Sequence, residues 1–159
     1  MHIFTRQLLE ELGAKAATSP RGRTNFNIHA SAADPIQRFF IVANRQSYFR
    51  PHRHPSKAEL ALVIAGQFDV LTFDDRGVVT ARYVVGGDAE AFGFETPPAT
   101  WHTLLARRDG GAFFEIKEGP YDPAAAAEFA PWAPPEGDAS VSKFMQWLET
   151  AQPGAAPPR

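Results

Sequence analysis

Short β-rich runs separated by turn-forming residues fill the chain between about residue 24 and residue 118, and they limit the fold more than any other feature. Valine, isoleucine, threonine and aromatic side chains fit the half-buried surface of a β-sheet, and closely spaced short strands are typical of a sandwich or barrel. No long helical segment interrupts them, which argues against a parallel α/β sheet. The sequence therefore predicts an all-β fold. The runs are IQRFFIVA, SYFRPH, ELALVIA, QFDVLTFD, VVTARYVV, AFGFET, WHTLLA and AFFEIK.

Three clusters of aspartate and glycine lie between these runs. Such residues favour tight turns, because aspartate bonds to nearby backbone and glycine adopts a positive φ angle. Each cluster is therefore predicted as a hairpin turn, and neighbouring strands are expected to be antiparallel. The clusters are Asp74-Asp75-Arg76-Gly77, Gly86-Gly87-Asp88 and Arg108-Asp109-Gly110-Gly111.

The composition changes on both sides of the β-rich part. Residues 1–22 are predicted as a helical segment packed on the barrel, with leucines on one face of a helix from Thr5 to about Ala17. Residues 23–120 are expected to form the β-barrel. Residues 121–150 are expected to be a proline-rich wrap followed by a helix from Ala139 to Thr150, and residues 151–159 a disordered tail.

Charge and cysteine content exclude several functions. The chain has 159 residues, no cysteine and a net charge of -2, so a disulfide, a thiolate metal site and a cysteine nucleophile are excluded. The chain has no block of basic residues of the kind that indicates nucleic-acid binding. The longest aliphatic run, Leu60 to Ala65, is far below the about 20 residues of a membrane-spanning helix. The N-terminus lacks the apolar core of a signal peptide, and we expect a cytoplasmic protein without membrane contact.

A histidine pair carries the strongest chemical signal. His52 and His54 are two residues apart at the end of a predicted strand, and residues i and i+2 of a strand point to the same face. Both imidazoles can therefore reach one point, as a metal ion requires. Pro55 ends the strand, and Glu59 begins the next one, so its carboxylate can face the same interior.

A third imidazole comes from His102, near the start of a later predicted strand that Pro97 and Pro98 precede. Three imidazoles and one carboxylate suit iron, manganese, nickel, zinc or cobalt, and affinity order alone does not choose among these metals. An isolated strand histidine is usually structural, and we interpret His2 and His29 in this way. The sequence therefore predicts one divalent transition metal ion per chain, and no residues for an organic cofactor.

The spacing of these residues resembles the motifs of the cupin superfamily. His52-x-His54, Glu59 and Gly66 resemble the first cupin motif, and the segment from Pro97 to His102 resembles the second. The resemblance implies a cupin (RmlC-like) jelly-roll β-barrel with His52, His54, Glu59 and His102 as metal ligands and Gly66 as the turn between two strands. Three positions depart from the motifs without removing a ligand: Gln46 and Ala99 stand in place of glycine, and Ala106 in place of asparagine.

More closely, the chain resembles the WbuC-type cupin fold metalloproteins, a bacterial group often associated with surface-polysaccharide gene clusters. The resemblance covers roughly residues 25 to 135 and implies a fold and a metal site but no reaction. The shared segments are Asn27-Ile28-His29, Asp34-Pro35-Ile36-Gln37-Arg38, Arg50-Pro51-His52-Arg53-His54-Pro55, Phe73-Asp74-Asp75, Trp101-His102-Thr103 and Glu115-Ile116-Lys117-Glu118-Gly119-Pro120-Tyr121.

Two functions remain open at this stage. One is a metal-dependent isomerase, epimerase, hydrolase or dioxygenase acting on a small sugar-like or carbonyl compound, with the metal as Lewis acid. The other is a module that binds or senses such a compound without changing it. A lysine or arginine beside the metal would favour an anionic ligand, and we expect a homodimer. The catalytic residues are unknown; the candidates, assigned to the interior by strand alternation, are Arg50, Lys57, Glu115, Lys117 and Gln37.

Overall fold

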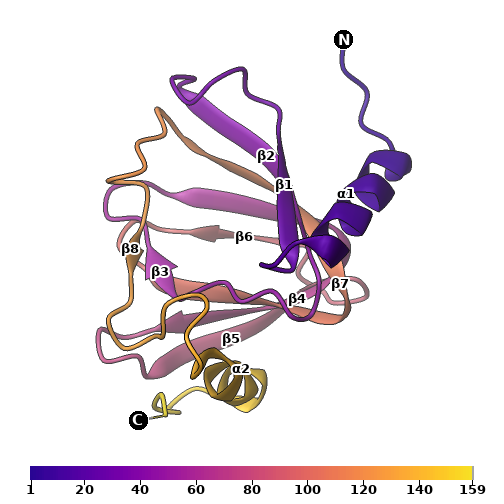
Figure 1. Cartoon of the computed structure of the whole chain (residues 1–159). Helices are drawn as coiled ribbons and strands as arrows, with labels where there is room; N and C mark the ends of the chain where they lie inside the picture. Colours follow the sequence, from indigo (N-terminus) through magenta and orange to yellow (C-terminus); the bar gives the residue numbers. More distant parts are fainter. Residues whose placement is uncertain (159) are drawn as a thin grey trace.

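Two long antiparallel strands, β4 (Glu59–Phe73) and β7 (Trp101–Glu118), pair along most of their length and pass through both layers of a β-sandwich (Figure 1). The structure is a computed structural model and describes residues 1–158. The other elements, in chain order, are α1 (Arg6–Thr18), β1 (Arg23–Asn27), β2 (Ile36–Ala43), β3 (His52–Arg53), β5 (Val79–Gly86), β6 (Gly93–Thr96), β8 (Glu128–Phe129) and α2 (Val141–Thr150).

Each layer uses one half of the two long strands. The first layer contains β1, β2, the second half of β7, the first half of β4, and β6. The second layer contains β8, β3, the first half of β7, the second half of β4, and β5. Every strand pair within residues 1–158 is antiparallel, as predicted, apart from one isolated parallel bridge between Val85 and Ala91. The all-β jelly-roll prediction is confirmed.

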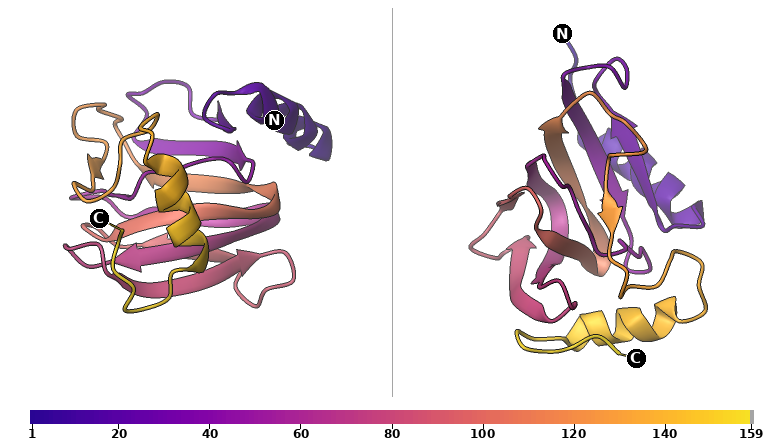
Figure 2. Two further views of the ribbon diagram at one scale, coloured as in Figure 1. Left: turned by 60° about the horizontal axis from the view of Figure 1, so that its bottom comes forward. Right: turned by 90° about the vertical axis from the view of Figure 1, so that its left-hand side faces the viewer.

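Three apolar clusters hold the layers together. Phe68, Phe113 and Leu104 belong to the cluster between the sheets. Helix α2 covers the outer face of the second layer, where Phe144 and Leu148 pack on residues of β4, β5 and β7 (Figure 2). Helix α1 covers part of the first layer through Leu12 and Ala16, which pack on Phe40, Val42 and Ala112. No helix within residues 1–158 has the length and apolar character needed to cross a membrane.

The predicted hairpin turn at residues 108–111 is wrong, because these residues lie inside β7. The strand segments on either side both pair with β4 instead of with each other. The register shifts where Gly66 and Gly111 face one another, and Arg108 and Gly110 have positive φ angles of 45° and 92°. Aspartate and glycine are common both in tight turns and in β-bulges, so the local pattern alone does not distinguish the two. Likewise, Gly66 marks a bend within β4 and does not separate two strands.

The C-terminal segment is ordered against the barrel, which corrects the prediction of a disordered tail from residue 151. Ala151 is buried, Gly154 donates its N–H to the carbonyl of Val79, and Val79 donates to the carbonyl of Ala155. Strand β5 pairs with β4 alone, so its free edge presents unpaired backbone groups that the tail satisfies. Composition cannot reveal this pairing. Arg159, also part of the predicted tail, lies outside the described residues.

Candidate metal centre

The sheet brings His52, His54 and His102 together in the interior. His52 on β3 lies opposite His102 on β7 in the antiparallel register, and His54 follows β3 directly. The ring centroid of His52 lies 4.5 Å from that of His102 and 5.1 Å from that of His54. One nitrogen from each of the three rings lies within 4.8 Å of the others. The three histidines therefore form a group that could hold one metal ion.

Backbone carbonyl groups fix the orientation of all three rings. Nδ1 of His52 lies 3.0 Å from the carbonyl oxygen of Arg50. Nδ1 of His54 lies 2.5 Å from the carbonyl oxygen of Ala126, and Nδ1 of His102 lies 3.0 Å from that of Thr100. A carbonyl oxygen only accepts hydrogen bonds, so we assign the proton of each ring to Nδ1. Nε2 of each ring then carries a lone pair, as in histidines whose second nitrogen is held while the first binds a metal.

The carboxylate of Glu59, at the start of β4, completes the group. Its Oε2 lies 2.8 Å from Nε2 of His54, and its Oε1 lies 3.8 Å from Nε2 of His102. Both Nε2 atoms are buried without a hydrogen-bond partner. Lone pairs of these nitrogens and a carboxylate therefore face one another in a buried site, an arrangement that repels unless a cation lies between them. The Nε2 atoms and the carboxylate are therefore suited to bind a metal ion.

The ionisation states favour metal binding. Burial, with the neighbouring His102, lowers the pKa of His52 to about 3, so this imidazole is neutral at physiological pH. Burial favours the protonated form of Glu59, whereas the ammonium group of Lys117, 3.5 Å from Oε2, favours its carboxylate form and lowers its pKa. A neutral imidazole at His52 and a carboxylate at Glu59 suit a borderline divalent transition metal.

A strained turn at Ala99, just before the strand that carries His102, is hydrogen-bonded to the segment that carries His54. Ala99 has a φ angle of 61° and donates its N–H to the carbonyl of His54 at 2.8 Å. This is one of the positions where the resemblance expects glycine. The left-handed conformation costs an alanine about 1 kcal/mol or more relative to glycine. The turn therefore fixes the position of His102 relative to His54, and the strain at Ala99 lowers the stability of the protein.

We expect Ala99→Gly to stabilise the protein by about 1 kcal/mol, because glycine adopts this φ angle without strain. For a chain of this size, that corresponds to a rise in melting temperature of about 2–4 °C, which calorimetry can measure. Ala14→Gly is the matched control, since Ala14 is exposed within α1 and glycine there costs about 1 kcal/mol. Equal destabilisation by both substitutions would contradict the strain at Ala99.

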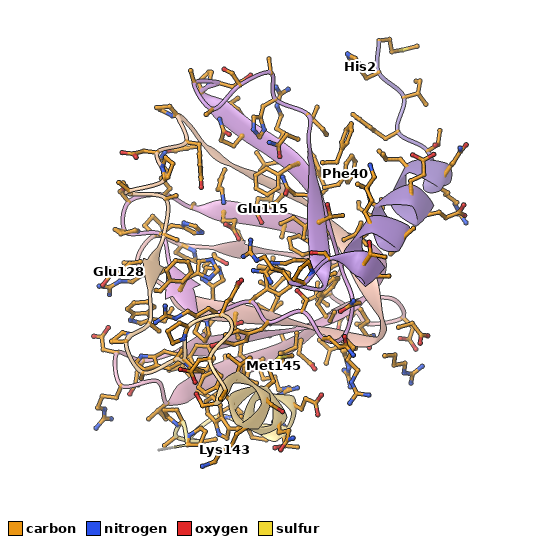
Figure 3. The ribbon with its side chains drawn as sticks, in the orientation of Figure 1. His2, Phe40, Glu115, Glu128, Lys143 and Met145 are labelled. Carbon is orange, nitrogen blue, oxygen red and sulfur yellow. The ribbon has the colours of Figure 1, made fainter. Side chains whose placement is uncertain are left out.

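Two of the five candidate catalytic residues lie beside this group. Glu115 and Lys117 alternate along β7 and point into the space between the layers, where Figure 3 labels Glu115. Nζ of Lys117 lies 2.9 Å from Oε1 of Glu115 and 3.5 Å from Oε2 of Glu59. Burial and the nearby charge of Glu59 raise the pKa of Glu115 to about 8. Burial lowers the pKa of Lys117, but the carboxylates of Glu115 and Glu59 outweigh it and raise it overall.

The other three candidates hold loops in place. Gln37 is buried and donates to the carbonyls of Asp34 and Ala32. The guanidinium group of Arg50 donates to the carbonyls of Ala130 and Ala133 in the proline-rich wrap, and the ammonium group of Lys57 donates to those of Glu118 and Pro120. The structure therefore does not place Arg50 in the interior: residues 47–51 are not in a strand, so strand alternation does not apply to them.

A cavity of about 480 Å³ opens next to Lys117. It lies along the inner face of β1 and β2, and a smaller cavity of about 70 Å³ shares Gln37, Lys117 and Tyr121 with it and reaches His54. The sequence analysis does not predict this cavity, although it assigns two of the lining residues, Gln37 and Lys117, to the interior, and Asn27, His29 and Tyr121 fall in segments of the family resemblance. The lining residues are Asn25, Asn27, His29, Ala30, Ser31, Ala32, Gln37, Phe39, Lys117 and Tyr121.

Solved structures with the same fold are numerous and distant in sequence. The capsular polysaccharide assembling protein CapF from Staphylococcus aureus is 16% identical, with a TM-score of 0.59 over 70% of this chain and 30% of CapF. Protein SO0799 from Shewanella oneidensis is 11% identical, with a TM-score of 0.56 over 85% and 90% of the two chains. Recombinant oxalate oxidase in complex with glycolate is 15% identical, with a TM-score of 0.54 over 73% of this chain.

These similarities show the fold, which is the cupin jelly roll. The chain spans 59% of the length of the oxalate oxidase. No curated protein is significantly similar in sequence. Residues 4–85, just over half of the 159 residues, match the family described as "Domain of unknown function (DUF6016)", and the chain therefore belongs to that family.

Proposed function

We propose that this protein is a metal-binding cupin in which His52, His54, His102 and Glu59 hold one divalent transition metal ion, and that it acts on a small sugar-like or carbonyl compound. One observation carries the proposal. Three imidazoles have Nδ1 held by backbone carbonyls, and their Nε2 atoms converge beside the carboxylate of Glu59. Iron, manganese, nickel, zinc and cobalt all accept this set of donors.

When bound, the ion supplies Lewis acidity toward an oxygen atom of the ligand. The side chains beside it divide the remaining work. Lys117 presents an ammonium group that attracts an anionic ligand, and its carboxylate partners Glu59 and Glu115 hold Nζ in place. Glu115 is buried and has its pKa near 8, so at neutral pH it can hold a proton and exchange it with a group of matching acidity. Isomerisation, epimerisation, hydrolysis and dioxygenation all remain open reactions.

Two finer statements belong to this proposal. The resemblance to WbuC-type cupins, together with the fold shared with a capsular polysaccharide assembling protein, supports a role in surface-polysaccharide or sugar-nucleotide metabolism. The oxalate oxidase of similar fold binds glycolate, a small hydroxycarboxylate, which supports a small anionic ligand. A cytoplasmic homodimer remains a prediction from the sequence.

A metal titration tests the proposal. The purified chain is stripped with a chelator and titrated with Zn²⁺, Mn²⁺, Co²⁺, Ni²⁺ and Fe²⁺ while binding and melting temperature are followed. We expect one ion per chain, and we expect the ion at 100 times its dissociation constant to add about 2.7 kcal/mol to the free energy of unfolding. Failure of every metal to saturate near one equivalent would contradict the proposal.

A further inference from the structure

We infer that the cavity beside Lys117 binds a polyhydroxy monocarboxylate, a sugar acid, with its carboxylate toward Lys117 and its hydroxyl groups toward Asn25 and Asn27. The inference rests on the proposed function, because Lys117, toward which the ligand carboxylate points, contacts Glu59 of the metal site proposed above. It adds the chemical class of the ligand and the residues that recognise it.

The cavity has the size and position of a ligand site. Its volume of about 480 Å³ falls within the range of about 300–1,000 Å³ for small-molecule sites. Lys117 and Gln37 line both this cavity and the smaller one that reaches His54. A ligand that occupies the larger cavity therefore lies next to the smaller one, which His54 lines.

Charge favours an anionic ligand. No aspartate or glutamate lines the larger cavity, and Lys117 contributes an ammonium group there. With a divalent ion bound, the ion and Lys117 carry three positive charges, and Glu59 and Glu115 carry at most two negative charges between them. At least one positive charge therefore remains, and a ligand carboxylate offsets it, whereas a neutral ligand does not.

The opposite wall offers neutral hydrogen-bonding groups. Residues alternate along β1, so that Phe26 packs against Phe4 on the side of α1, while Asn25 and Asn27 line the cavity. Nδ2 of Asn25 donates to Oδ1 of Asn27 at 2.7 Å, which orients the two amides. A carboxamide has two donor hydrogens and an acceptor oxygen, so the pair retains both donors and acceptors for the hydroxyl groups of a polyol.

The Phe39 ring adds an apolar surface between the two ends. Nζ of Lys117 lies 5.1 Å from the centroid of this ring, so the ring and the two carboxylates hold the ammonium group from different sides. The remaining surface of the ring can contact the carbon chain of the ligand. A hydrocarbon acid would make no hydrogen bonds with the two asparagine side chains, and a neutral polyol would not offset the positive charge. A molecule with both kinds of group therefore matches the cavity better than either.

Three commercial compounds with six-carbon chains test this inference on the zinc-loaded protein. Gluconate has the carboxylate and the hydroxyl groups, sorbitol has only the hydroxyl groups, and hexanoate has only the carboxylate. We expect calorimetry or ligand-observed NMR to show that gluconate binds at least about tenfold more tightly than either of the others, because each lacks one set of polar contacts.

Two cavity variants and one control complete the experiment. Lys117→Met is expected to weaken gluconate binding about tenfold, and Asn27→Ala about fivefold, with zinc content near one per chain. Lys15→Met, on the exposed side of α1, is expected to change neither value. If Lys117→Met fails to fold or to hold zinc, Asn27→Ala decides the result.

The inference would be overturned if sorbitol or hexanoate bound within about threefold of gluconate, or if Asn27→Ala left gluconate binding unchanged. In either case a zinc content near one per chain would still support the proposed metal site. Failure of the unaltered protein to bind zinc or any of the other four metals near one equivalent would instead reject the proposed function, and the inference would fall with it. Zinc content, measured on every sample, separates the two failures.

Discussion

His102→Ala is expected to lower the metal content of the protein from about one ion per chain to less than about one tenth, while the β-sandwich stays folded. His102 is completely buried, and its Nε2 faces the carboxylate of Glu59. Alanine removes a donor from the centre of the group and leaves a gap that no neighbouring side chain fills with another nitrogen. Substitution of a metal's supporting residues alone costs about 10–100-fold in affinity, and loss of a ligand costs more.

Elemental analysis after purification measures this result, and circular dichroism reports the fold. His52→Ala and Glu59→Ala are expected to behave like His102→Ala, because each removes one of the four proposed donors. His2→Ala is the matched control, since His2 is exposed on the N-terminal segment, far from the site in Figure 3. Stoichiometric metal in both His52→Ala and Glu59→Ala would show that the ligands lie elsewhere.

The sequence predicted the histidine pair because the geometry involved is local. Alternation along an extended chain places residues 52 and 54 on one face, whatever surrounds them. The partnership with His102 depends on strand register, which residue spacing does not reveal. The sequence offers a third histidine near the start of a later predicted strand, and the resemblance to cupins implies the same residue as a ligand. Alternation predicts that Glu115 and Lys117 share one face of a strand, and in the structure, where both lie in a regular part of β7, Nζ of Lys117 is 2.9 Å from Oε1 of Glu115.

The remaining parts of the site depend on contacts across the fold. The carbonyl of Ala126 orients His54, but a backbone group leaves no trace in residue identity. Strand alternation predicts Arg50 in the interior, but β3 begins only at His52. The guanidinium group of Arg50 instead donates to backbone carbonyls of the proline-rich segment, at Ala130 and Ala133. Asn25 and Asn27 lie on an edge strand of only five residues, too short and too polar for its inner face to be recognised from hydrophobic alternation.

Gly66→Ala is expected to destabilise the protein by about 3 kcal/mol or more, because two effects act on one residue. The φ angle of Gly66 is 69°, in the region that disfavours any side chain. A Cβ atom there would lie 2.2 Å from the carbonyl oxygen of Gly110 and 2.6 Å from Cα of Gly111. Both are backbone atoms of β7, so a rotamer change cannot relieve the contact, and the paired strands must separate.

Gly13→Ala is the matched control for this substitution. Gly13 lies within α1, and an added Cβ meets no atom within 4 Å, so alanine is expected to stabilise the protein by about 0.5–1 kcal/mol. Urea denaturation at constant metal concentration measures both changes from the transition midpoints. Equal midpoints for Gly66→Ala and the unaltered protein would contradict the close approach of β4 and β7 at their bend.

The bend at Gly66 also bears on the metal centre. Glu59 lies on the half of β4 that belongs to the first layer, whereas His52 and His102 lie in the second layer. The two layers meet through β4 and β7, so the distance from the carboxylate to the imidazoles depends on how closely these strands approach at Gly66 and Gly110. We therefore expect Gly66→Ala to weaken metal binding as well as stability, although residue 66 contacts none of the ligands, and Gly13→Ala to leave metal binding unchanged.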